Sequence, residues 1–205
     1  MKTLRFTFPF VLASLASFAG AAPSQLEVSQ HNEKRWQLFD QPTFNPYLAQ
    51  VVEKALTQEC MALWKQGNGP AAVTKCKEAL NAYPTSVLAH RMLADMFELL
   101  ARSPAVSKEQ RAQLQQFDRE HRTSAEAIIL SILASGDGKS EQTAYSVITI
   151  SEEYMVVWYS GLSVKQQSPH TIGDKTFDIL EVQDKDGNTS RIFFDVSRLR
   201  AKTEK

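Results

Sequence analysis

A change from helical to strand periodicity near residue 136 constrains the fold of this chain more than any other feature. Before this point, apolar residues recur at intervals of three and four, which is the spacing of amphipathic helices. Residues 135–140 contain two glycines, and short runs rich in β-branched and aromatic residues follow them. The pattern predicts an α+β fold, with a helical region over residues 22–135 and a small α+β unit over residues 136–205.

The helical region contains both cysteines of the chain, Cys60 and Cys76, each on the apolar stripe of a separate helix. The first stripe consists of Leu48, Val52, Leu56, Cys60 and Leu63, and the second of Val73, Cys76, Leu80 and Tyr83. A turn at residues 65–70 separates the helices, and each cysteine is eight residues from Asn68, so a hairpin brings the two level. The spacing predicts an intramolecular disulfide, with two buried free thiols as the alternative.

A weak internal repeat at a 34-residue offset matches the first helical hairpin to the segment that follows it. Residues 53–84 resemble one tetratricopeptide repeat, because small residues stand where its second helix requires close contact: Ala72, Cys76 and Ala79. The second copy degenerates after Phe97, whereas a solenoid generally needs three or more units. We therefore expect TPR-like helical hairpins in a compact bundle of four or five helices. Two interpretations of this bundle remain: its helices form a peptide-binding groove, or their apolar faces serve only to pack the core.

The C-terminal unit contains three strand-like segments, at residues 145–150, 177–182 and 191–196. Asp186 and Gly187 lie between the last two segments, and an Asp-Gly pair in this position is a strong hairpin signal. Ser151, followed by two glutamates, is typical of a capped helix start, and this helix is expected to extend to Tyr159. We expect a small antiparallel β-sheet with one short helix.

The first 21 residues have the three-part pattern of a signal peptide. Lys2 and Arg5 form the basic start, residues 6–18 are mostly apolar, and small residues follow at 19–22. The apolar run is shorter than the roughly 20 residues that a membrane-spanning helix needs. We predict cleavage near Ala21 and export to the periplasm or the medium, with no membrane span in the mature chain.

Charge and residue spacing exclude several classes of function. Lys2 and Arg5 are the only charged residues of the first 21, so the exported chain has a net charge of about −2 and no basic stripe for nucleic acid. Residues 138–140 end like a phosphate loop, but the glycine that such a loop needs five residues earlier is replaced by Leu133. The four histidines lack the spacing of metal ligands: His31, His90, His121 and His170. We expect no catalytic, cofactor-binding or metal-binding residues.

Several short blocks occur in order along the second half of the chain, at residues 136–140, 143–145, 147–148, 151–154, 161–162, 167–168 and 194–197. Over about residues 130–197 they resemble the C-terminal signature of an uncharacterised bacterial family, domain of unknown function 4919. The resemblance implies secreted proteins with a helical N-terminal part and a small mixed C-terminal unit, and it supplies no activity. Residues 168–170, Ser-Pro-His, depart from the aliphatic residue expected after the Gln-Ser pair. The candidate functional surface is taken from polar residues of these blocks: Asp137, Lys139, Glu152, Glu153, Tyr154 and Asp195.

Two classes of function remain. The first is a non-catalytic binding protein of the cell envelope whose helical part recognises a protein or peptide, with neutralisation of a toxin as one version. The alternative is a small envelope hydrolase that combines Asp178, Asp195 and His170 with the loop at residues 136–140. The two are distinguished by whether these side chains converge in one pocket.

Overall fold

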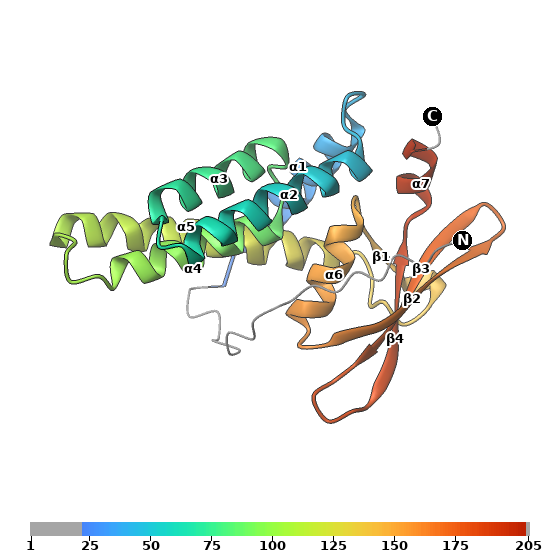
Figure 1. Cartoon of the computed structure of the whole chain (residues 1–205). Coiled ribbons are helices and arrows are strands. Elements are labelled where there is room, and N and C mark those ends of the chain that lie inside the picture. Colours follow the sequence, from blue (N-terminus) through green and yellow to red (C-terminus); the bar gives the residue numbers. More distant parts are fainter. Residues whose placement is uncertain (1–21, 204–205) are drawn as a thin grey trace.

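The computed structural model describes residues 22–203, in which a bundle of helices precedes a small sheet (Figure 1). The first five helices are α1 (Gln25–Asp40), α2 (Pro46–Lys65), α3 (Gly69–Ala82), α4 (Val87–Ala101) and α5 (Lys108–Leu133). After them come η1 (Glu141–Thr143), β1 (Tyr145–Ser146), α6 (Ile150–Tyr159), β2 (Ser163–Ile172), β3 (Lys175–Gln183), β4 (Thr189–Asp195) and α7 (Ser197–Thr203). The predicted α+β class is confirmed. The predicted signal peptide lies outside the described residues.

The helical region consists of two antiparallel hairpins, α2–α3 and α4–α5, and α1 packs against α5 (Figure 1). Each of these five helices begins at a serine or asparagine whose side chain accepts a hydrogen bond from the backbone of the first turn. At the start of α5, Ser107 and Gln110 complete a capping box. The turn predicted between the two cysteine-bearing helices joins α2 to α3. No helix within residues 22–203 is long and apolar enough to cross a membrane.

A disulfide joins Cys60 of α2 to Cys76 of α3, with a Cα–Cα distance of 5.5 Å. Both side chains are fully buried, and Leu93, Met96 and Phe97 of α4 belong to the same apolar cluster. The disulfide therefore fixes the first hairpin at the point where it meets the second.

The sheet is mixed, with the strand order β1-β4-β3-β2. β3 and β4 form the predicted antiparallel hairpin, and β2 pairs antiparallel with β3, but β1 is parallel to β4. The strand predicted at residues 145–150 is too long. The chain leaves the sheet after Ser146, and Thr149 caps α6. Thr149, not Ser151, is thus the capping residue of this helix. The sequence pattern also missed β2 and α7.

One apolar core connects the helices to the sheet. It contains Val87 from α4, Ile128 from α5, Val156 from α6, Leu180 from β3 and Phe194 from β4. The change in secondary structure near residue 136 therefore lies within a continuous core, and α6 packs between the bundle and the sheet (Figure 1).

Candidate functional site

The loop at residues 136–140 is a tightly packed turn. A Cβ atom on Gly136 would lie 2.3 Å from the carbonyl oxygen of Thr143, and Gly138 has a positive φ of 66° and lies against the ring of Tyr145. Both positions thus require glycine for close approach of the backbone. Asp137 and Lys139 are exposed on this loop and pair at 3.4 Å. Such a pair is typical of a solvated surface contact.

Asp195 also has a structural role. Its Oδ1 atom accepts hydrogen bonds from the backbone nitrogen of Ser197 at 3.0 Å and from the Ser197 hydroxyl at 2.6 Å. The carboxylate therefore stabilises the start of α7, where the positive end of the helix dipole favours negative charge.

Glu152 and Glu153 do not lie on the surface, contrary to the sequence expectation. They are 2% and 0% exposed, because α6 is covered by the bundle on one side and by the sheet on the other. Adjacent residues of a helix point about 100° apart, and each glutamate accordingly has its own set of partners. The predicted candidate residues therefore do not form one exposed face.

Glu152 faces the bundle and forms a bidentate ion pair with Arg35 of α1. The Arg35 Nε atom donates to Oε1 at 2.8 Å and Nη2 donates to Oε2 at 2.7 Å. Glu152 also accepts from the backbone nitrogen of Ile148 at 2.9 Å, and Arg35 donates to the Ser131 hydroxyl at 3.2 Å. Good geometry and additional hydrogen bonds are what a buried ion pair needs to offset the cost of desolvation.

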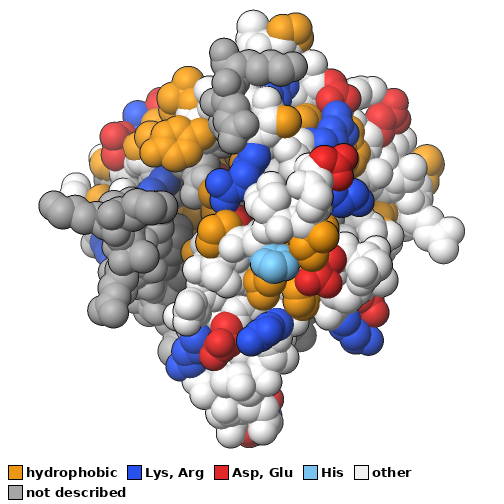
Figure 2. All heavy atoms as spheres, turned by 90° about the vertical axis from the view of Figure 1, so that its right-hand side faces the viewer, with side chains coloured by type: hydrophobic (Ala, Val, Ile, Leu, Met, Phe, Trp, Pro, Cys, Tyr) orange, Lys and Arg blue, Asp and Glu red, His pale blue; other side chains and the backbone are white. Residues whose placement is uncertain are grey.

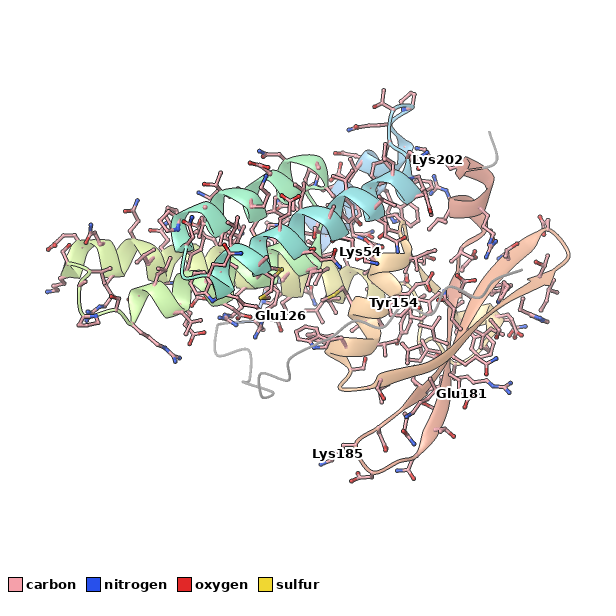
Figure 3. The ribbon with its side chains drawn as sticks, in the orientation of Figure 1. Lys54, Glu126, Tyr154, Glu181, Lys185 and Lys202 are labelled. Carbon is pink, nitrogen blue, oxygen red and sulfur yellow. A yellow bond between two sulfur atoms is a disulfide. The ribbon has the colours of Figure 1, made fainter. Side chains whose placement is uncertain are left out.

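Glu153 faces the sheet, where Gln167 of β2 connects it to Asp178 of β3. The Gln167 Nε2 atom donates to Glu153 at 3.1 Å and to Asp178 at 2.9 Å, while the Tyr154 hydroxyl donates to Gln167 Oε1 at 2.7 Å. Burial, and then the Asp178 carboxylate, raise the pKa of Glu153 well above its usual value. Within the described part of the chain, Glu153 Oε1 has no hydrogen-bond partner. Figure 3 shows Tyr154 on α6 between the bundle and the sheet.

Asp178 reaches a cleft at the junction of α2, α7 and the sheet. Arg200 of α7 contacts its carboxylate at 3.4 Å, and the cleft has a volume of about 180 Å³. Its lining is mostly apolar and comes from α2, α6, β3, α7 and the residue before α7: Pro46, Tyr47, Gln50, Ile150, Asp178, Val196, Leu199 and Arg200. Figure 2, which views the molecule from the side of α7 and the sheet, shows charges of both signs interspersed with small hydrophobic groups.

Exposed apolar side chains on the first turns of α2 continue from this cleft. Tyr47, Leu48 and Val51 are 67%, 58% and 48% exposed, and Tyr47 itself lines the cleft. Leu48 is therefore an exposed member of the apolar stripe predicted for this helix. The buried positions of α2 include Ala49, Glu53 and others: Pro46, Thr57 and Cys60. Polar Glu53 lies inside because the Ser86 hydroxyl donates to its carboxylate.

The residues of the hydrolase alternative do not converge. His170 and Asp195 both lie opposite Phe177 in the sheet register, so their side chains share its face. Asp178 follows Phe177 directly, and successive residues of a strand point to opposite faces. Across residues 22–203, no three His, Cys, Asp or Glu side chains form a group that could hold a metal ion.

The sequence pattern indicated Glu152, Glu153 and Asp178 but missed the residues that pair with them and most of the cleft lining. Arg35 is 117 residues from Glu152, and Arg200 lies in a short helix that was not predicted. In the sequence, Gln167 stands out only as part of a block that resembles the family. Tyr47 precedes Leu48, the first residue of the predicted apolar stripe, but does not belong to that stripe. An apolar residue in this position was the only signal for Tyr47 in the sequence.

A family model described as "Domain of unknown function (DUF4919)" matches residues 37–205. The match begins within α1 and covers the helices as well as the sheet, so it extends well beyond the resemblance at about residues 130–197. No curated protein and no solved structure matches the chain. The family match covers most of the sequence, and the chain belongs to the DUF4919 family.

Proposed function

We propose that this protein is an exported, non-catalytic binding protein of the cell envelope, which recognises a segment of another protein at the cleft between α2, α7 and the sheet. One observation carries the proposal: an apolar cleft continues into three exposed apolar side chains on adjoining turns of α2, Tyr47, Leu48 and Val51. Grouped apolar side chains at a concave site are typical of interaction surfaces, and tyrosine is enriched there.

The free edge of the sheet is a less favourable place for a partner. β1 and β2 are the edge strands, β1 has only two residues, and the pairing of β2 with β3 is interrupted by a bulge at Lys165. Pro169 also lies in this strand. A lysine, a proline and a bulge are features that oppose addition of a further strand. This supports the cleft over the sheet edge as the binding site.

The disulfide supports the export part of the proposal, because disulfides persist mainly in oxidising compartments. The hydrolase alternative gains no support, since Asp178 and the pair of His170 and Asp195 point to opposite faces of the sheet. N-terminal sequencing of the protein from fractionated cells tests the export step. A mature chain starting near Ala22 in the envelope fraction or medium is expected, and an unprocessed chain in the cytoplasm would contradict export.

The binding step is tested by cross-linking the tagged protein inside the cells that make it, followed by affinity capture and mass spectrometry. Leu48→Glu and Val51→Glu place a charge on the proposed surface and should reduce the captured partner strongly. Met61→Glu is the matched control, because Met61 is 39% exposed on the same helix but lies ten residues, about 15 Å, from Val51. A partner captured equally by all three variants would place the interaction elsewhere.

A further inference from the structure

The size of the cleft limits what can enter it. A cavity of 150 Å³ holds a benzene ring, whereas pockets for whole drug-sized ligands are about 300–1,000 Å³. At about 180 Å³, this cleft accommodates one large apolar side chain but not a complete cofactor. A single side chain presented by a peptide fits this volume.

The more exposed charge in the described lining of the cleft is the positive charge of Arg200. Among the described residues, the charged side chains of the lining are Asp178 and Arg200, which are 4% and 45% exposed. The Asp178 carboxylate is therefore enclosed by protein and already accepts from Gln167 and Arg200. The arginine guanidinium has five N–H donors in a planar fork, so it can donate to Asp178 and to a second carboxylate at the same time.

The flanking residues of α7 hold Arg200 in place. Arg198 pairs with Asp40 at 2.6 Å, and Lys202 donates to the carbonyl oxygens of Phe39 and Gln41. Figure 3 shows Lys202 on α7 beside the segment that connects α1 to α2. These contacts fix a short helix against the end of α1, so the Arg200 guanidinium is positioned at the cleft before a ligand arrives.

We propose that the cleft binds a peptide segment that carries an apolar side chain next to a carboxylate, with the apolar group against Tyr47 and Leu199 and the carboxylate on Arg200. This inference rests on the proposed function and specifies the chemistry of its ligand. Charges of both signs are interspersed on this face (Figure 2). The carboxylate is therefore recognised by Arg200 itself and not by a broad positive surface.

The test is a selection of a phage-displayed library of random dodecapeptides against the mature protein with its disulfide intact. Enriched peptides are then synthesised, each with a twin in which the carboxylate is replaced by the corresponding amide. Their affinities are measured for the wild type, Arg200→Gln, Tyr47→Ala and the control Lys185→Gln. Lys185 lies at the tip of the β3–β4 hairpin, well away from α7 (Figure 3).

We expect selected peptides to combine aromatic or aliphatic residues with Asp, Glu or the free C-terminus. Removing either the peptide carboxylate or the Arg200 charge should weaken binding about tenfold, and removing both should cost little more than either alone. Lys185→Gln should bind like the wild type. If Arg200→Gln does not fold, the amide twins on the wild-type protein still measure the contribution of the carboxylate.

Two other outcomes separate this inference from the function on which it rests. Peptides that depend on Tyr47 but bind equally well as amides would overturn the carboxylate inference and leave the binding site standing. A selection without enrichment, or with peptides indifferent to both Tyr47 and Arg200, would contradict the inference and the proposed cleft together.

Discussion

At the scale of single residues, Glu152 and Glu153 are neighbours whose charges are neutralised in different ways. Arg35 compensates the Glu152 charge through a bidentate ion pair in the interior. For Glu153, burial and then the Asp178 carboxylate raise the pKa, and the opposing effect of Arg200 is smaller, so the protonated form is favoured. A salt bridge thus compensates the charge of one buried acid, whereas the raised pKa of the other favours its neutral form.

The raised pKa of Glu153 predicts that its contribution to stability depends on pH. Above pH 4.5 the unfolded chain loses this proton while the native state keeps it, so the free energy of unfolding falls as the pH rises towards the folded pKa. In the Glu153→Gln variant, the side-chain amide at this position does not titrate. In urea unfolding series, the stability of this variant relative to the wild type should increase with pH across that window.

The difference between the two proteins is the quantity to measure, because other buried groups titrate as well. Burial lowers the pKa of His90 to about 4, so His90 has the opposite effect and reduces stability as the pH falls below 6.5. Such terms are common to both proteins and cancel in the comparison. Wild-type and variant curves that run parallel from pH 4.5 to 8 would show that Glu153 does not bind an extra proton in the native state.

Residue-scale features were predictable from the sequence only where they depend on nearby positions. Cys60 and Cys76 are 16 residues apart in a hairpin, so their approach follows from helical spacing alone. The burial of Glu152 depends on Arg35, which is 117 residues away and gives no local signal. The two acids therefore resembled ordinary exposed residues at a helix start.

At the scale of elements, those with a strong hydrophobic period were predicted and those without one were missed. β3 and β4 carry the apolar residues of the core face, including Leu180, Val182 and Phe194, and their hairpin signal is clear. β2 is mostly exposed and contains Pro169, so it has no alternation to detect. α7 spans only seven residues and has three basic side chains, too short a segment for helical periodicity.

The contact between α1 and α6 should depend strongly on one ion pair. Arg35→Met leaves the Glu152 carboxylate buried without its cation, and we expect a loss of about 3–5 kcal/mol in the free energy of unfolding. The double variant Arg35→Met with Glu152→Gln removes the unpaired charge and should regain much of that loss. Chemical denaturation of the three proteins measures both effects. Similar instability of the single and double variants would show that packing of Arg35, not its charge, is important.

The α2–α3 hairpin should depend on its disulfide. Cys60 and Cys76 are separated by 16 positions, and replacing both by alanine removes the cross-link that closes the loop between them. We expect the free energy of unfolding to fall by roughly 3 kcal/mol. Reduction of the wild-type protein should lower its free energy of unfolding, measured by urea denaturation, by a similar amount. An oxidised protein no more stable than the alanine variant would contradict this role.

At the scale of the whole molecule, the helices and the sheet share one core. Residues of α4, α5 and α6 pack against residues of β3 and β4 in a single cluster, and the family match at residues 37–205 also spans both parts. The cleft is a product of this arrangement, because its lining comes from α2, α6, β3 and α7. The sequence predicted both halves but could not predict a site that exists only where they meet.

The shared core predicts that residues 22–135 do not fold cooperatively alone. Without the sheet, side chains such as Ile128, Ile129 and Ile132 would lose the apolar surface that covers them. We expect the isolated segment to bind hydrophobic dyes and to melt without a sharp transition, whereas residues 22–205 unfold in a single step by calorimetry. A segment 22–135 with its own sharp transition would establish two independent domains.

The most direct test of binding at the cleft is a photo-crosslinking amino acid introduced at position 47, compared with the same group at exposed position 74 on α3. Both proteins are irradiated in the cells that make them, and the adducts are identified by mass spectrometry. We predict one dominant protein adduct from position 47 that is absent from position 74 and is lost when Val51→Glu is added. Adducts that are the same at both positions, or none above background at position 47, would contradict a binding site at this cleft.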